Sequence, residues 1–124
     1  MKTIKYLFMG ALMTVFSGSA MAQTSVNDAV NAIKTNKDKA AVASIVKAAV
    51  KENKKDPKAL AAIGRAYLDV KDTTSTRKYA DMSIALTNKM KTGKVGDGFM
   101  LMGDLEYYKD NPGAAAAMYQ NAYT

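Results

Sequence analysis

Residues 56–88 read DPKALAAIGRAYLDVKDTTSTRKYADMSIALTN, and this stretch decides the fold. The opening Asp-Pro pair predicts a helix start, because Asp accepts hydrogen bonds from free backbone N–H groups and Pro is tolerated in a first helical turn. Apolar residues then recur at Leu60, Ile63 and Tyr67, which is the spacing of one helical face. The short polar residues at 72–75 favour a turn. The stretch therefore predicts two antiparallel helices.

The same pattern recurs on both sides of this stretch. Moving back 34 positions pairs Gly64 with Val30 and keeps both helices in register, and moving forward 39 positions pairs it with Gly103. The additional residues of the longer interval fall in the loop at 91–98. A helix–turn–helix unit that repeats after 34 residues is the sequence sign of a helical repeat array.

The repeated unit resembles the tetratricopeptide repeat (TPR) family over residues 26–122. The family pattern has an aromatic residue, then Leu-Gly and then Tyr in its first helix, and Ala, an aromatic residue and Ala in its second. The matching positions are Leu60, Ile63, Gly64 and Tyr67 in the middle unit, and Phe99, Met102, Gly103, Ala115, Tyr119 and Ala122 in the last. Two positions depart from the pattern: Val30 replaces a glycine, and Glu106 stands where Tyr is usual.

The resemblance implies an all-α fold, namely an α-solenoid of about three antiparallel helix pairs. The repeat domain would cover residues 23–124, with units at about 23–55, 56–90 and 97–124. The sequence pattern predicts six helices and no strand. The expected helices lie near 25–35, 38–53, 57–70, 74–88, 97–109 and 112–123.

Residues 1–22 are predicted to be a secretory signal peptide rather than part of the fold. Two lysines make its start positive, an apolar run occupies residues 6–16, and Ala20-Met21-Ala22 has the small-x-small pattern of a cleavage site. The apolar run is about half of the roughly 20 residues that a membrane span needs. We therefore expect cleavage near Ala22 and an exported protein, periplasmic or secreted, with no membrane span in the mature chain.

The charge balance raises the alternative of an anionic partner. The chain carries 18 Lys and Arg against 11 Asp and Glu, a net charge of +7, and lysines gather at residues 47–58. Acidic residues are mixed among these lysines, and no aromatic residue interleaves them. We interpret the cluster as a solvated helix end that complements the helix dipole. We expect no nucleic-acid partner.

Composition also argues against catalysis. The chain has no histidine and no cysteine, which removes the commonest general bases, nucleophiles and soft metal ligands together. The carboxylate pairs Asp69/Asp72 and Asp104/Glu106 lie among polar residues at spacings that do not make them converge. Methionines between residues 100 and 118 have helical spacing and are interpreted as adaptable core residues. The sequence thus predicts no enzyme, no cofactor and no metal site.

The resemblance implies instead a groove, lined by the first helix of each unit, that holds a segment of a partner protein. A clamp for a terminal carboxylate, known in some family members, is not supported because Asn27 and Leu101 occupy two of its positions. The groove runs from polar and basic to acidic and aromatic, which suits a protein or peptide segment of mixed character. The residues expected on this face are Asn27, Asn31, Lys34, Lys58, Ala61, Arg65, Leu68, Asp69, Met100, Asp104, Tyr107 and Tyr108.

Two hypotheses of function follow from this face. The first is an exported protein–protein interaction module, a scaffold or adaptor. The alternative is a carbohydrate or cell-wall binding module of the envelope, in which Tyr107 and Tyr108 stack on sugars. The first would capture a protein partner, and the second would capture glycan that survives protease treatment.

The last predicted helix raises the question of self-association. No charged side chain lies between Asp110 and Thr124, and the helix carries four consecutive alanines followed by Met118 and Tyr119. Because each unit of a repeat array leaves one side apolar for its neighbour, we expect this surface to be covered. It would either pair with a second copy or be followed by further units, and the longer array is favoured.

Overall fold

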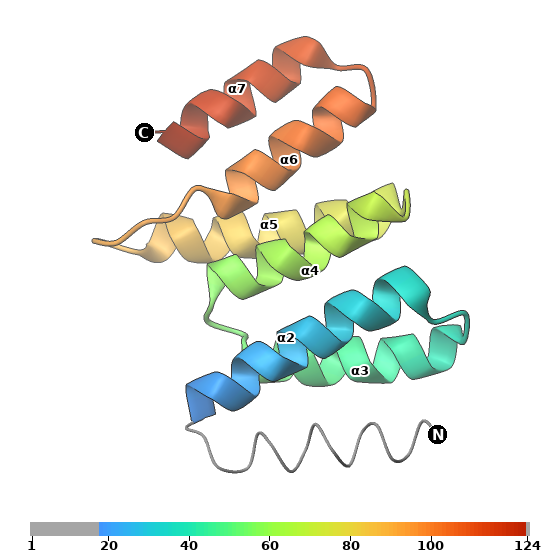
Figure 1. Cartoon of the computed structure of the whole chain (residues 1–124). Coiled ribbons are helices and arrows are strands. Elements are labelled where there is room, and N and C mark those ends of the chain that lie inside the picture. Colours follow the sequence, from blue (N-terminus) through green and yellow to red (C-terminus); the bar gives the residue numbers. More distant parts are fainter. Residues whose placement is uncertain (1–17, 124) are drawn as a thin grey trace.

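The computed structural model describes the backbone of residues 18–123 and the side chains of residues 24–123 (Figure 1). The described chain is all-helical and contains no strand, which confirms the predicted all-α class. Five of the six predicted helices agree with the observed bounds to within one residue at each end. The helices are α2 (Gly18–Thr35), α3 (Lys39–Glu52), α4 (Pro57–Asp69), α5 (Thr73–Lys89), α6 (Asp97–Tyr108) and α7 (Pro112–Tyr123).

The start of α2 was predicted wrongly. The prediction placed a helix cap at Ser25, whereas α2 begins at Gly18 and Ser25 lies inside it. The intervening residues are mostly Ala, Met and Gln, which are strong helix formers and extend the helix backwards. Most of the predicted signal peptide, residues 1–17, lies outside the described residues.

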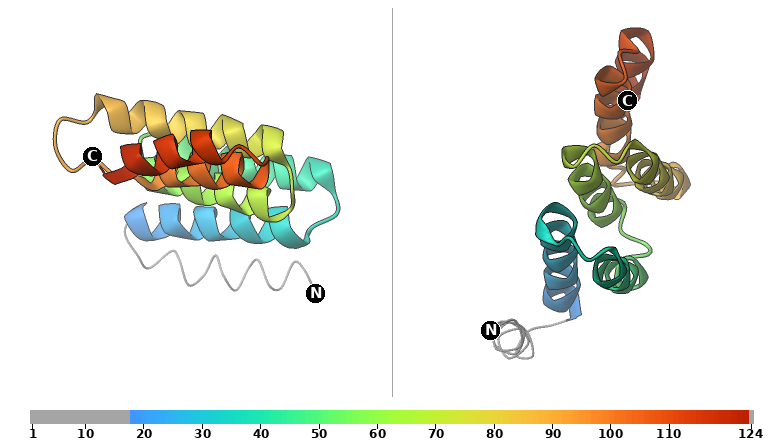
Figure 2. Two further views of the ribbon diagram at one scale, coloured as in Figure 1. Left: turned by 90° about the horizontal axis from the view of Figure 1, so that it is seen from above. Right: turned by 90° about the vertical axis from the view of Figure 1, so that its right-hand side faces the viewer.

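Consecutive helices pair, and the pairs follow one another in chain order (Figure 1). Within this stack α2 contacts α4, and α4 contacts α6, so the first helices of the pairs form a continuous column. Viewed along the helices, α3 and α5 both lie on one side of that column (Figure 2, right). The two junctions differ: α5 packs against α6, but no Cα atom of α3 lies within 8 Å of one in α5.

Aspartate residues begin three of the helices. Asp38, Asp56 and Asp72 are the N-caps of α3, α4 and α5, and each carboxylate accepts hydrogen bonds from backbone N–H groups of the first turn. Pro57 follows Asp56 at the first helical position, as the Asp-Pro pair predicts. These caps explain why the predicted boundaries of α3, α4 and α5 are accurate.

The turns inside the second and third pairs have the same geometry. Lys71 and Asp110 both adopt the left-handed conformation, with φ of 68° and 65°. After each, a backbone N–H donates back to a helix carbonyl: Asp72 N to Tyr67 O at 2.9 Å, and Asn111 N to Glu106 O at 2.8 Å. Lys71 and Asp110 stand 39 positions apart, the interval of the sequence repeat, so one turn geometry occurs twice.

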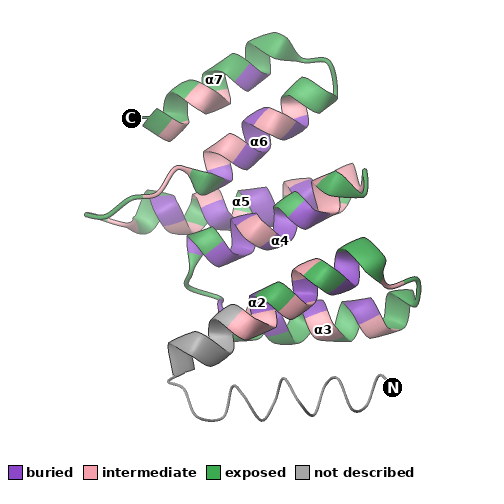
Figure 3. Ribbon diagram, in the orientation of Figure 1, coloured by how far each residue is buried: buried purple, intermediate pink, exposed green. Residues whose placement is uncertain are grey.

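The core runs along the stack as two clusters (Figure 3). The first lies among α2, α3, α4 and α5, with Leu60 and Ile63 fully buried at its centre. The second lies among α5 and α6 and is built on Leu101 and Leu105. Burying one such side chain contributes roughly 1.5–3 kcal/mol, so α4 and α6 hold the stack together through their apolar faces.

Gly64 lies where three helices meet. A Cβ atom at this position would lie 2.6 Å from Leu101 Cδ2 on α6 and 3.1 Å from Tyr79 Cβ on α5. The prediction that Gly64 marks a close helix approach is confirmed, and the contact includes α6 as well as the paired helix. Separately, none of the described helices has the length and apolar character that crossing a membrane requires.

Candidate functional site

The residues predicted for the binding face lie on α2, α4 and α6, the first helices of the three pairs. Most of them are exposed, whereas Leu68, Met100 and Asp104 are half-buried and Ala61 is buried. Leu68 packs against the second core cluster, so it supports the fold more than it offers an open surface. The others form the surface that we call the first-helix face.

Two ion pairs join neighbouring helices on the first-helix face. Lys34 Nζ on α2 lies 3.3 Å from Asp69 Oδ2 on α4, and Arg65 Nη2 on α4 lies 2.7 Å from Asp104 Oδ2 on α6. The side chains are between about one third and one half exposed, so each pair contributes at most about 1 kcal/mol to stability. Their main effect is to hold the charged groups in fixed positions across the face.

Asp104 has a second partner behind the face. Tyr119 on α7 donates its hydroxyl hydrogen to Asp104 Oδ1 at 2.5 Å. This hydrogen bond, together with partial burial and the nearby negative charge, raises the pKa of Tyr119 to about 12. The phenol is therefore protonated at every physiological pH, and Asp104 links α4, α6 and α7.

A cleft of about 390 Å³ opens between α4 and α6 on the first-helix face. Three of its lining residues are apolar, two are cationic and one is a carboxylate. Such a cleft can take a small apolar side chain of a partner while the charged groups bind polar atoms beside it. Its lining residues are Lys58, Ala61, Ala62, Arg65, Asp97 and Met100.

The sequence analysis placed Lys58, Ala61, Arg65 and Met100 in the groove, and the structure brings these four together in this cleft. It missed Ala62 and Asp97. A signal for Asp97 was present, because it follows Lys58 by 39 positions and the repeat register therefore sets the two residues side by side.

The remaining predicted residues do not join this cleft. Asn27 and Asn31 lie on α2, and Tyr107 and Tyr108 lie at the far end of α6. Tyr107 is 68% exposed and Tyr108 is 49% exposed. Adjacent residues on a helix point about 100° apart, so these two rings do not form one flat platform. Lys71 Nζ also covers the Tyr108 ring, 5.1 Å from its centroid.

Comparison of the chain with known protein families, with curated proteins and with solved structures finds no match. Among the residues that the structure describes, no three His, Cys, Asp or Glu side chains gather into a possible metal site. The features of this chain that bear on its function are the cleft, the ion pairs and the repeated geometry.

Proposed function

We propose that this chain is an exported protein–protein interaction module of the TPR-like α-solenoid type, which binds a partner segment on its first-helix face. One observation carries the proposal: positions separated by the repeat interval meet in space. Arg65 and Asp104 form an ion pair at 2.7 Å, and Lys58 and Asp97 line one cleft. Stacked equivalent units produce this neighbourhood, because each unit contacts only the next.

The first-helix face suits a peptide segment for a physical reason. Its charges alternate in sign, and the lysine and arginine side chains stand beside carboxylates rather than in one basic patch. The cleft between α4 and α6 offers apolar lining residues for one anchoring side chain. A segment with a small apolar anchor flanked by polar or charged residues complements this surface, and anchors of this kind dominate binding energy.

The carbohydrate alternative has less support. A sugar-binding platform needs an accessible aromatic face, but Tyr107 and Tyr108 diverge on α6 and Lys71 covers the second ring. The cleft between α4 and α6 lies instead near Ala61 and Met100, and no aromatic side chain lines it. The geometry therefore favours a peptide partner.

Site-specific photocrosslinking in the native host tests the proposal. A photoreactive residue at Ala62 lies in the cleft, and one at the exposed Ala48 of α3 is the matched control on the other side of the stack. We expect a protease-sensitive adduct from position 62 and none from position 48. Replacing Lys58 by Glu should reduce that adduct several-fold without changing the melting temperature.

Two outcomes would contradict the proposal. An adduct of equal yield from both positions would place the partner on another surface. An adduct that resists protease and is removed by glycan-degrading enzymes would support the carbohydrate alternative.

A further inference from the structure

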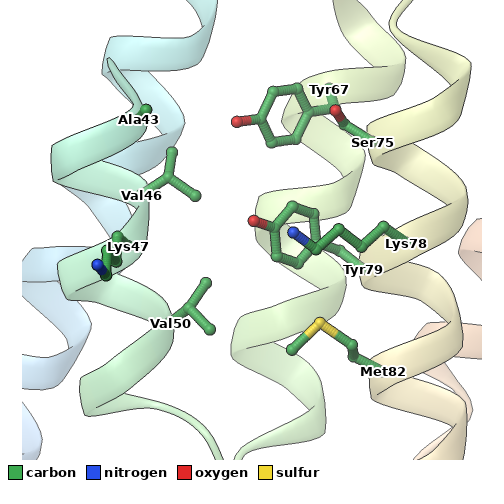
Figure 4. A pocket seen from close by; sticks show the side chains of 9 residues that line it. All are labelled: Ala43, Val46, Lys47, Val50, Tyr67, Ser75, Lys78, Tyr79 and Met82. Atoms are coloured by element: carbon green, nitrogen blue, oxygen red, sulfur yellow. The ribbon is translucent and has the colours of Figure 1, made fainter. Parts of the chain in front are cut away.

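A second cleft, of about 450 Å³, lies on the opposite side of the stack, between α3 and α5 (Figure 4). It exists because α3 and α5 remain apart, whereas α5 and α6 pack directly. Val46 and Val50 of α3 form one wall, and Tyr79 and Met82 of α5 form the other. An apolar gap of this size falls within the volume range of small-molecule sites.

Four side chains with hydrogen-bond donors line this cleft, two tyrosines and two exposed lysines. The rings of Tyr67 and Tyr79 are stacked, with centroids 5.7 Å apart and an interplanar angle of 3°, and both hydroxyl groups point toward α3 (Figure 4). Lys78 Nζ lies 5.3 Å from the centroid of the Tyr79 ring. Lys47 lines the cleft from the α3 side.

These four donors have no protein acceptor. In the described part of the chain, no side-chain hydrogen bond or ion pair involves the hydroxyls of Tyr67 and Tyr79 or the ammonium groups of Lys47 and Lys78. No carboxylate lines the cleft. Burial raises the pKa of both tyrosines, so both phenols remain donors at neutral pH. The cleft thus combines largely apolar walls with two lysine ammonium groups that form no ion pair in the described part of the chain.

One carboxylate beside the cleft is already hydrogen-bonded within the protein. An adjoining cleft of about 480 Å³ shares Ala43, Tyr67 and Ser75 with the first and includes Asp72, whose negative charge acts on Tyr67. Asp72 accepts hydrogen bonds from the backbone N and the Oγ of Ser75, at 3.1 and 2.8 Å, which ties it to the start of α5. Lys37 and Lys39 line this neighbouring cleft as well, so positive charge continues along the groove.

We propose that the cleft between α3 and α5 binds an amphiphilic carboxylate of the medium-chain fatty acid class. The hydrocarbon chain lies along Val46, Val50 and Met82, and the carboxylate accepts hydrogen bonds from the two tyrosine hydroxyls and the flanking lysines. Charge-assisted hydrogen bonds in a partly apolar site are the strong ones, and the four donors match the acceptor capacity of one carboxylate.

The walls suit a hydrocarbon chain. Val46, Val50 and Met82 line the cleft with apolar side chains, and a hydrocarbon chain has no polar groups that such walls would leave without hydrogen bonds. The site is independent of the proposed partner-binding function, because it opens between α3 and α5 and, although Tyr67 belongs to α4, it uses no residue of the first-helix face.

Calorimetric titration of the folded protein with decanoate tests the proposal, with decanol and acetate as probes of the head group and the chain. We expect decanoate to bind, decanol to bind at least tenfold more weakly, and acetate to show no binding. Across shorter and longer carboxylates, affinity should rise by up to about fourfold per methylene until the cleft is filled.

Variants locate the site. Lys47→Glu and Lys78→Glu should each weaken decanoate binding about tenfold or more, whereas Lys51→Glu, an exposed α3 residue outside the cleft, should change it less than twofold. NMR of methionine methyl groups gives a readout that needs no substitution: decanoate should shift the Met82 signal and leave that of the buried Met102 unchanged.

Three results would overturn the proposal. Equal affinity for decanol and decanoate would show that the charged head is not recognised. Unchanged affinity in both lysine variants, or no shift of Met82, would place binding elsewhere. An acidic amphipathic peptide that binds here while decanoate does not would assign the cleft to a protein partner.

Discussion

Arg65 on α4 and Asp104 on α6 stand 39 positions apart in the sequence, and their side chains meet at 2.7 Å. The interval is that of the sequence repeat, so the ion pair joins equivalent positions of neighbouring helix pairs. Because Tyr119 of α7 donates to the same carboxylate, Asp104 ties the last two helices to the middle of the stack. Replacing Asp104 should therefore lower the stability of the protein and change the pKa of Tyr119.

Replacing Asp104 by Asn should lower the pKa of Tyr119 from about 12 toward the ordinary tyrosine value near 10, because the strongest acceptor of its hydroxyl hydrogen is removed. NMR titration of labelled tyrosine, with Tyr119→Phe to assign the signal, measures this change. Asp81→Asn, at an exposed carboxylate of α5, is the control and should leave the pKa of Tyr119 unchanged. An unchanged Tyr119 titration in Asp104→Asn would contradict the assigned hydrogen bond.

The same pKa gives a pH dependence of stability. Tyr119 titrates higher in the folded chain than in the unfolded one, so its hydrogen bond contributes fully below about pH 10. The contribution is lost as the pH rises from about 10 through 12. Urea unfolding should show that raising the pH from 8 to 11 lowers the stability of the Tyr119→Phe variant less than that of the wild type.

Gly64→Leu should destabilise the protein by about 1–3 kcal/mol or more, because even a Cβ atom there would lie 2.6 Å from Leu101 and 3.1 Å from Tyr79. Gly113→Leu is the control: its Cβ would meet nothing within 4 Å, and leucine is the better helix former. Urea unfolding followed by circular dichroism measures both variants. Equal stabilities for Gly64→Leu and the wild type would mean that α4 and α6 are not packed at Gly64.

Local signals explain why the helices were predictable from the sequence. Asp56 and Asp72 cap their helices with their own side chains, and Leu60 and Ile63 follow a helical period that the core confirms. The early start of α2 was not predictable in the same way, because Ser25 has the chemistry of a cap but strong helix formers precede it. Where a helix begins therefore depends on the helix propensity of the residues before a possible cap as well as on the cap itself.

The site was predictable only in part, because its clefts depend on how far neighbouring helices stand apart. Lys58 and Arg65, which the repeat register set on one face, line one cleft. The register contained no information on the opening between α3 and α5, where the stacked rings of Tyr67 and Tyr79 line the second cleft. Glu106 stands where the repeat pattern has Tyr, and its side chain forms an ion pair with Arg77 on a different helix. A repeat period carries no information about such a partner.

The left-handed turn at Asp110 predicts that Gly and Ala variants will rank in opposite order of stability at two neighbouring positions. At this position Gly should be more stable than Ala by about 1 kcal/mol, because φ is 65° and an L side chain is strained there. At the preceding Lys109, φ is −83° and the order should reverse, since Gly loses more backbone entropy. Melting temperatures of the four variants test the pair of claims. If Ala were more stable than Gly at both positions, Asp110 would have an ordinary backbone conformation.

A buried hydroxyl joins the two helices of the middle pair. Ser83 Oγ on α5 donates to the carbonyl oxygen of Pro57 at 2.7 Å, and the serine is fully buried. Ser83→Ala should therefore lower the free energy of unfolding by about 1 kcal/mol. Ser44→Ala, at an exposed position of α3, is the matched control and should change stability little. If both variants unfold at the same urea concentration, the hydrogen bond makes no net contribution.

The ion pair between Arg77 and Glu106 predicts that a second substitution will restore part of the stability that the first one removes. Arg77 Nη2 lies 2.8 Å from Glu106 Oε1, and the glutamate side chain is only 15% exposed, so the arginine is the charged partner of a carboxylate that is largely shielded from water. Arg77→Met leaves this carboxylate without its cation and should be destabilising by about 1–3 kcal/mol. Adding Glu106→Leu removes the orphaned charge, and the double variant should regain part of that loss. Urea unfolding of the two single variants and the double variant measures the coupling. If the effects of the single variants simply add, the pair contributes nothing beyond its separate contacts, and α5 and α6 are held together by the core around Leu101 alone.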